Sequence, residues 1–252
     1  MDLGITGKRA LVLGAGGGLG GAIAKALAEE GAHVIGTSRK PPETASPPAA
    51  SWHALDLFDK STIDRLADAL LAEGGVDILV NNSGGPPPSE AQSSSFENWT
   101  SQFAAMGAGL FHLTNRLLPK MIERRWGRII TVASSGVQQP IPRLALSNGI
   151  RAAVQGWSKT LAAEVAAHGV TVNLILPGRI ETARVMQIDT DAAKRQNASL
   201  ESIQDAQKSG IPAGRYGTPE EFGKVAAFLA SQHASYVTGT SIRVDGGLIR
   251  SV

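Results

Sequence analysis

The sequence has no cysteine, only 2 tyrosines and almost no net charge. Its 252 residues include 24 Lys+Arg and 22 Asp+Glu, which gives a formal net charge of +2 at pH 7. The absence of cysteine excludes disulfides, thiolate nucleophiles and thiolate metal sites, and the sequence predicts no metal centre. Because the charge excess is small and no basic stripe or set of stacking aromatics is present, a nucleic-acid partner is not expected.

Long apolar runs are also missing. No run approaches the length of a membrane span, and the opening segment MDLGITGKRA lacks the apolar core of a signal peptide. The sequence therefore predicts a cytoplasmic protein without a membrane partner. Hydrophobic residues make up 42% of the chain, and its length is enough to bury the core of one large α/β domain.

Short apolar segments alternate with helical ones along the whole chain. Strands are predicted over residues 10–13, 32–37, 77–80, 128–133, 170–176 and 241–244, and helices over 22–30, 63–72, 96–125, 144–167 and 220–230. Strand–turn–helix–strand units build parallel sheets. The pattern predicts one α/β domain over residues 1–252, a Rossmann-like doubly wound parallel sheet with helices on both faces.

Three segments interrupt this alternation. Residues 39–51 are rich in proline and predict a loop in place of a helix, while 84–95 contain three consecutive prolines and predict an irregular segment. Residues 181–214 are polar with a weak helical pattern, and they follow the carboxyl end of a predicted strand. Since ligands of such sheets bind at the carboxyl ends of the strands, 84–95 and 181–214 are predicted substrate loops.

A glycine cluster, Gly14-Ala-Gly-Gly-Gly18-Leu19-Gly20, follows the first strand and opens the first helix. Glycine permits a tight turn and close approach to a pyrophosphate, and the helix N-terminus offers free N–H groups. An ordinary strand–helix turn is the alternative, but this placement favours dinucleotide binding. Ser38 and Arg39 end the second strand, where an acid would suit NAD and an arginine suits a 2′-phosphate. NADP(H) is therefore favoured over NAD(H), with a solvated basic turn as the alternative.

Five motifs between Gly7 and Gly247 resemble the short-chain dehydrogenase/reductases, in particular the 3-oxoacyl-acyl-carrier-protein reductases. They are Gly14-x-x-x-Gly18-x-Gly20, Asp56-Leu57, Asn81-Asn82-Ser83-Gly84, Pro177-Gly178-x-Ile180-x-Thr182 and Val244-Asp245-Gly246-Gly247. The resemblance implies an NAD(P)-dependent oxidoreductase with a seven-stranded Rossmann-like sheet, a small-molecule substrate and a homo-oligomeric assembly, a tetramer or a dimer.

The resemblance also implies roles for the cofactor-binding residues. The three motif glycines, with Leu19, would form the phosphate turn, and Asp56 would bind the adenine amino group beside Leu57. Asn82 and Gly84 would line the adenosine-ribose side. After the turn at Pro177 and Gly178, Ile180 and Thr182 would contact the nicotinamide carboxamide.

The catalytic positions depart from the family pattern of Ser, Tyr, Lys and a helix Asn. The family Ser falls at Ser134, but Ser147 occupies the Tyr position, Arg151 the Lys position and Met106 the Asn position. Arg151 keeps a positive charge and can donate to ribose hydroxyls or an oxyanion, but it cannot act as a proton-relay acid. The resemblance places both tyrosines, Tyr216 and Tyr236, outside the catalytic cleft.

Two functions fit these replacements. The first is an oxidoreductase of atypical mechanism, acting on a carbonyl/alcohol or related substrate, with Ser134, Ser147 and Arg151 as its candidate catalytic residues. A substrate that supplies its own proton, or that accepts hydride at an activated C=C or C=N bond, would tolerate the missing acid best. The second is a catalytically weak or inactive NADP(H)-binding sensor or assembly protein. An arginine at the Lys position favours the first.

Overall fold

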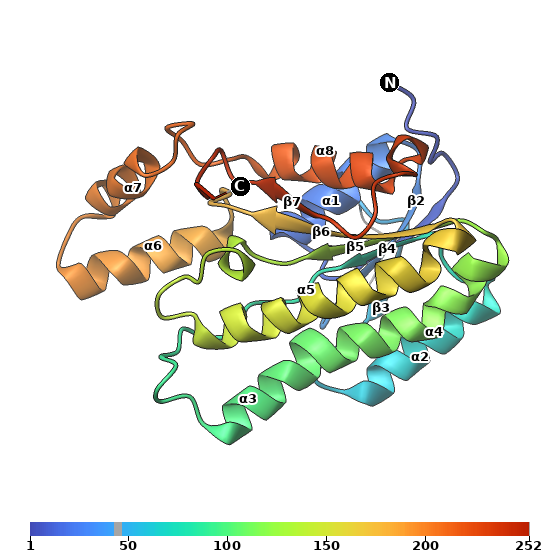
Figure 1. The fold of residues 1–252 in the computed structure, drawn as a ribbon, viewed down its shortest axis with the longest axis horizontal. Coiled ribbons are helices and arrows are strands. Elements are labelled where there is room, and N and C mark those ends of the chain that lie inside the picture. The colour runs from blue at the N-terminus through green and yellow to red at the C-terminus, as the bar shows by residue number, and fades with distance from the viewer. Residues whose placement is uncertain (43–46, 252) are drawn as a thin grey trace.

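The computed structural model describes residues 1–42 and 47–251, and its centre is a parallel sheet of seven strands in the order β3-β2-β1-β4-β5-β6-β7 (Figure 1). The strands are β1 Arg9–Val12, β2 His33–Ser38, β3 Ser51–Ala54, β4 Ile78–Asn81, β5 Gly127–Val132, β6 Val170–Pro177 and β7 Ser241–Val244. This confirms the predicted Rossmann-like fold class. The inner strands are buried apolar runs, as expected where helices cover both faces.

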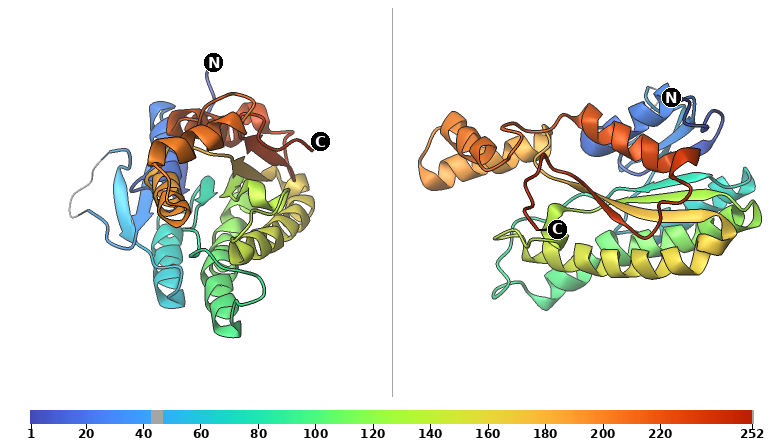
Figure 2. Two further views of the ribbon diagram at one scale, coloured as in Figure 1. Left: turned by 90° about the vertical axis from the view of Figure 1, so that its left-hand side faces the viewer. Right: turned by 45° about the horizontal axis from the view of Figure 1, so that its top comes forward.

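Helices cover both faces of the sheet (Figure 2). The longer ones are α1 Gly18–Glu29, α2 Lys60–Ala72, α3 Phe96–Phe103, α4 Gly109–Glu123, α5 Ala145–Val165, α6 Ala183–Gln196, α7 Leu200–Ser209 and α8 Pro219–Ala230. One apolar cluster joins α1 and α8 to the sheet, and a second joins α2, α4 and α5 to the opposite face. Across the two described stretches of chain, no helix is long and apolar enough to span a bilayer.

The strand order reverses between β1 and β4, which lie side by side at the middle of the sheet. In doubly wound sheets a ligand crevice opens at this point, outside the carboxyl ends of the strands. Here the two strand ends are joined by the Asn82 side chain, whose Nδ2 donates to the Leu13 carbonyl oxygen over 3.0 Å. That bond fixes the start of the glycine-rich turn against the end of β4.

Residues 181–214, where the sequence shows only a weak helical pattern, contain helices α6 and α7, which project beyond the sheet (Figure 1). Each begins at a hydroxyl cap, with Thr182 accepting from the Val185 N–H and Ser199 accepting from the Ser202 N–H. Both helices lie outside the two main layers, so most of their side chains meet solvent. Their weak apolar periodicity follows from this exposure.

Two smaller differences concern the edge of the sheet and the long helix. The predicted loop over residues 39–51 ends in an unpredicted strand, β3, which pairs with β2 and is only half-buried; residues 43–46 of that loop lie outside the described residues. The helix predicted over 96–125 consists of α3, a π-helical turn at Ala104–Ala108 and α4. Residues 84–95 are largely irregular, as predicted, with one isolated bridge from Ser89 to Leu144.

Candidate active site

The glycine-rich turn is compact because some of its glycines adopt backbone conformations that other residues rarely adopt, and another lies where a side chain would clash. Gly14 and Gly18 have φ values of +65° and +54°, in the left-handed region that favours glycine. A Cβ atom at Gly20 would lie 2.3 Å from the Gly14 carbonyl oxygen, so helix α1 can pack this closely only with glycine there. Gly17 caps α1 without a side-chain hydrogen bond. The N–H groups of the first helical turn are thus left for a ligand, as dinucleotide sites require.

Two cavities of about 470 and 700 Å³ open at the carboxyl edge of the sheet. Both are lined by Gly14, Gly17 and residues 82–85, so they form one continuous cleft with the glycine-rich turn at its centre. Cβ atoms at Gly17 and Gly84 would contact nothing, which shows that these backbones face open space. A cleft with two lobes either side of a helix N-terminus fits a dinucleotide, with its pyrophosphate at the turn.

The smaller cavity contains the predicted adenosine-side residues. Ser38, Arg39, Asp56, Leu57, Asn82 and Gly84 all line it. The Asp56 carboxylate accepts from the Phe58 N–H over 3.0 Å, which holds it at the cavity wall. The Ser38 Oγ is buried and finds no hydrogen-bond partner within the described residues. Arg39 is exposed beside it and forms no ion pair with another residue that the structure describes. An unpaired hydroxyl next to an unpaired cation fits a ribose phosphate.

The larger cavity is lined by the residues predicted for the nicotinamide side: Leu19, Pro177, Gly178, Ile180 and Thr182. A Cβ atom at Gly178 would lie 2.6 Å from the Asp245 Cα, so glycine is required where the turn after β7 passes β6. Ile180 is buried, and Thr182 caps α6 while its side chain faces Gly18 across the cleft.

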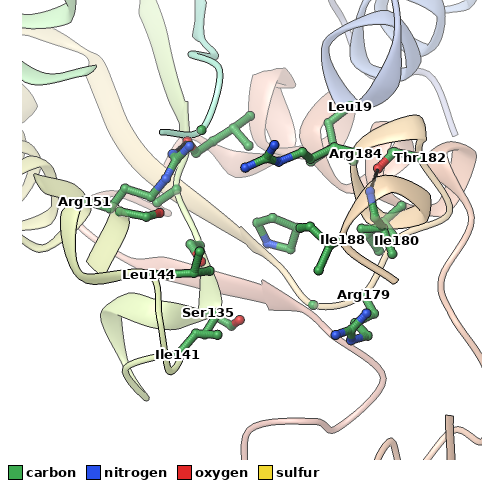
Figure 3. Close-up of a pocket in the computed structure, with 18 of the residues that line it drawn as sticks. Leu19, Ser135, Ile141, Leu144, Arg151, Arg179, Ile180, Thr182, Arg184 and Ile188 are labelled. Carbon is green, nitrogen blue, oxygen red and sulfur yellow. Dashed lines mark hydrogen bonds between the residues drawn. The ribbon is translucent and has the colours of Figure 1, made fainter. Parts of the chain in front are cut away.

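Ser134, Ser147 and Arg151 all line this larger cavity. The Arg151 Nη1 donates to the Val132 carbonyl oxygen over 2.7 Å, and Ser134 Oγ accepts from the Gly136 N–H over 3.0 Å. Figure 3 shows Arg151 reaching into the cavity from α5. Burial lowers the pKa of the Arg151 guanidinium to about 10. The group therefore remains charged at neutral pH, and the cavity holds a fixed positive charge beside a serine hydroxyl.

Met106, predicted to fall at the family's helix asparagine, lies in the π-helical turn and packs against Leu146, Ile150 and Trp99. It also lines the smaller cavity. A π-turn widens the helix locally and commonly occurs at functional sites. Here the π-turn carries an apolar side chain at the position where the predicted alignment would place an amide.

Neither tyrosine is among the described residues that line the cleft. The Tyr216 hydroxyl donates to Asp189 Oδ2 over 2.8 Å, and the same carboxylate accepts from Arg179 over 2.5 Å. Burial, together with the hydrogen bond to Asp189, raises the pKa of Tyr216 to about 12. Tyr236 is fully exposed. No phenol therefore stands at the position of the family's proton donor.

Two further side chains fix loop residues, Ile141 and Pro86, that line the larger cavity. Asn148 holds the loop before α5, since its Nδ2 donates to the Ile141 carbonyl oxygen and its Oδ1 accepts from the Ile141 N–H. Arg184, near the start of α6, lies across the cavity, where its Nη2 donates to the Pro86 carbonyl oxygen over 3.0 Å. These hydrogen bonds depend on loop conformation. For Arg184 the sequence does offer a signal, because an arginine two residues after Thr182, the last residue of a cofactor motif, lies close to the predicted site.

A parallel sheet with a two-lobed, glycine-lined cleft at its switch point defines a dinucleotide-binding α/β protein. A family model described as enoyl-(acyl carrier protein) reductase matches residues 14–249, and the chain belongs to this family of short-chain dehydrogenases/reductases, which are NAD(P)-dependent oxidoreductases. The 3-oxoacyl-[acyl-carrier-protein] reductase FabG of Haemophilus influenzae is 37% identical over 255 residues, covering 97% of this chain and 99% of that protein. Nodulation protein G of Azospirillum brasilense is 38% identical, covering 96% and 98%.

Solved structures show the same relationship. YwfH, described as an NADPH-dependent reductase involved in bacilysin biosynthesis, superposes with a TM-score of 0.92 at 30% identity, covering 98% of this chain and 100% of that one. L-sorbose reductase from Gluconobacter frateurii, solved with NADPH and L-sorbose, has a TM-score of 0.93 at 30% identity and full coverage of both chains.

Proposed function

We propose that this protein transfers hydride between NADP(H) and a carbonyl/alcohol or related substrate by a mechanism that lacks the Tyr–Lys pair. The observation that carries the proposal is the placement of Arg151. Its charged guanidinium lies in the same cavity as Ser134 and is held by the main chain of β5. An intact cofactor cleft that opens onto this charge supports a working site.

The bound cofactor supplies the hydride, and the protein's own groups would stabilise the charge that the hydride creates. When hydride adds to a polarised substrate, negative charge develops on the substrate oxygen. Arg151 and the Ser134 hydroxyl can donate hydrogen bonds to that oxygen in a largely apolar cavity, where such donors are most effective. Removal of one preorganised donor of this kind typically costs about 10²–10³-fold in rate.

The lack of a phenol determines which substrates suit the site. Reduction of a saturated ketone creates a strongly basic alkoxide, which needs a proton from a nearby acid. With an α,β-unsaturated carbonyl, hydride forms a C–H bond at the β carbon and the C=C electron pair shifts to give an enolate. The enolate oxygen is less basic than an alkoxide and can accept a hydrogen bond from Arg151. A water molecule positioned at Ser147 then protonates the α carbon. We therefore favour an activated C=C bond as the acceptor.

The preference for NADP(H) over NAD(H) is supported by the smaller cavity. Arg39 and the unpaired Ser38 hydroxyl lie together at the end of β2, where a 2′-phosphate would be bound. YwfH and L-sorbose reductase are both described with NADPH. The similarity of this chain to these two reductases supports NADP(H) as its cofactor.

A homo-oligomer, either a dimer or a tetramer, is also part of the proposal. A partly exposed aromatic group from α3, α4 and α5 supports it, since the Phe111 ring stacks on Trp157 with centroids 4.2 Å apart and Phe103 meets Phe111 edge-on. Phe103 is 38% exposed although it is apolar. Light scattering behind size-exclusion chromatography should give a multiple of 26.2 kDa, and Trp157→Glu should lower it.

The decisive experiment uses NADPH deuterated at the nicotinamide C4 and mass spectrometry of the products. Matched pairs should be compared, such as 4-phenylbut-3-en-2-one with 4-phenylbutan-2-one, together with 4-oxo-4-phenylbut-2-enoate, acetoacetyl-CoA and an imine. We expect deuterium at the β carbon of the enones, and a slower reaction of the saturated ketone. If NADPH binds but no acceptor gains deuterium, the sensor or assembly alternative replaces this proposal. Equal rates for ketone and enone would contradict the preference for C=C bonds.

A further inference from the structure

Two arginines from different helices extend into the larger cavity. Arg151 comes from α5, and Arg184 comes from the start of α6 on the opposite wall (Figure 3). Arg184 belongs to none of the cofactor motifs and has no part in the chemistry proposed above. Its position in the substrate cavity therefore needs a separate explanation.

The positive charge of these two groups is not balanced by the protein. Of the described residues that line the cavity, none is Asp or Glu. Within the described parts of the chain, neither Arg151 nor Arg184 takes part in an ion pair; each donates instead to a main-chain carbonyl oxygen, of Val132 and Pro86 respectively. A third arginine at the wall, Arg179, differs because Asp189 neutralises it. The cavity thus carries about two uncompensated positive charges.

The remaining wall of the cavity is mainly apolar. The apolar side chains come from the start of α1, the loop before α5, α6 and the C-terminal segment: Leu19, Ile141, Leu144, Val185, Ile188 and Leu248. Fixed cations beside an apolar wall create a positive potential that attracts an anion. At about 700 Å³, the cavity has room for a small organic molecule beside the cofactor.

We propose that the substrate is an organic acid with an apolar body, and that Arg184 binds its carboxylate. This inference rests on the proposed function, in which Arg151 and Ser134 serve the reacting oxygen. Arg184 is free for recognition because it stands at the exposed side of the cavity and uses Nη2 for Pro86, while its other N–H groups remain available. A guanidinium presents a planar fork that matches a carboxylate with two parallel hydrogen bonds. The carboxylate would then fix which carbon of the substrate faces the hydride.

The cofactor's own diphosphate is the competing anion, because Arg184 lies two residues after Thr182 and faces the same cavity as Leu19. The two possibilities differ in what Arg184 is needed for. Substrate recognition requires that loss of Arg184 leaves NADPH affinity intact. Diphosphate binding requires that NADPH affinity falls.

The test is calorimetric binding of three carboxylates, cinnamate, 3-phenylpropanoate and hexanoate, and of their primary amides, to the protein saturated with NADP⁺. A charge-assisted pair should make the acids bind about tenfold or more tightly than the amides, with an affinity that falls as salt rises. Arg184→Gln should abolish this preference and leave the NADPH dissociation constant unchanged. The matched control is Arg195→Gln, which removes an exposed arginine from the last turn of the same helix.

Equal binding of all three acids and their amides would overturn the inference, as would a loss of NADPH affinity in Arg184→Gln that matches its loss of acid affinity. The measurement needs no turnover, so it separates the two proposals. Acid-selective binding without deuteride transfer would overturn the proposed function alone. Deuteride transfer without acid selectivity would overturn the carboxylate assignment alone.

Discussion

The Arg151 guanidinium donates to the Val132 carbonyl oxygen over 2.7 Å, so a main-chain oxygen of β5, rather than a carboxylate, holds the cation of the active site. Val132 precedes Ser134 by two residues, which brings the end of β5 and the middle of α5 to one wall of the cavity. Because no acid among the described residues forms an ion pair with the guanidinium, its charge stays available to a ligand.

Arg151→Met should lower kcat/KM by about 10²–10³-fold, because the variant loses the donor to the developing oxyanion. Arg151→Lys should retain part of the activity, since an ammonium keeps the charge but not the planar set of donors. Steady-state kinetics with the best acceptor measures both, and Arg195→Met serves as the control for loss of a surface charge. A kcat/KM in Arg151→Met equal to that of the wild type would remove Arg151 from the chemistry.

Arg39→Ala should weaken NADPH binding by about tenfold or more, because a charged hydrogen bond to the 2′-phosphate is lost. NADH carries no such phosphate, so its affinity should change little. Fluorescence titration with NADPH and with NADH gives the ratio of the two dissociation constants. Lys25→Ala, on the exposed face of α1, is the control. Tighter binding of NADH than NADPH by the wild type would contradict the assignment.

Two glycine variants should separate stability from cofactor binding. Gly20→Ala should destabilise the protein by about 1–3 kcal/mol, because its Cβ meets the Gly14 carbonyl oxygen at 2.3 Å. Gly16→Ala meets nothing in the protein itself, yet Gly16 lines the smaller cavity. Its thermal midpoint without cofactor should match the wild type while its NADPH affinity falls. Unaltered NADPH binding in Gly16→Ala would argue against the placement of the cofactor there.

Tyr216→Phe should lower the free energy of unfolding by about 1–3 kcal/mol while kcat is retained, because the buried Asp189 carboxylate loses a hydrogen bond away from the chemistry. The pKa of Tyr216 is raised in the folded protein to about 12 from an ordinary value of 10. Folding therefore favours the protonated phenol, and the stability it contributes is present below pH 10 and is lost as the pH rises through about 12.

Urea denaturation from pH 8 to pH 12 should accordingly show the gap between the wild type and Tyr216→Phe narrowing above pH 10. The exposed Tyr236→Phe is the matched control and should follow the wild type throughout. A large loss of kcat in Tyr216→Phe would show that this tyrosine takes part in the reaction after all.

Most of the fold could be predicted because its signals are local. The buried strands are short apolar runs, and the turn after β1 carries its glycines in sequence order. The half-buried strand β3 could not be found this way, since its four residues gain their structure by pairing with β2. Helices α6 and α7 left only a weak helical pattern in the sequence, because they present little apolar surface to the sheet.

In the candidate site, too, the sequence predicts the features with local signals but not those that depend on packing between distant segments. Most of the predicted cofactor residues, and Ser134, line one cleft because they follow strand ends, which a parallel sheet gathers at one edge, whereas Ser147 and Arg151 reach the cleft from helix α5. The contacts of Asn148 with Ile141 and of Arg184 with Pro86 instead join segments through the conformation of irregular loops. Those conformations depend on packing between distant parts of the chain, which composition and spacing do not specify.

The isolation of α6 and α7 has an evolutionary consequence. Their buried apolar contacts form a small cluster of their own, Ala192, Ala193 and Ile203, separate from the two large clusters that hold the sheet. Apart from Asp189, which is buried against Arg179 and Tyr216, substitutions on the exposed faces of these helices can therefore accumulate at little cost to the folding of the domain. Since α6 also carries Arg184 and Ile188 into the cavity, new substrates can be acquired by changing residues that lie outside the two large apolar clusters.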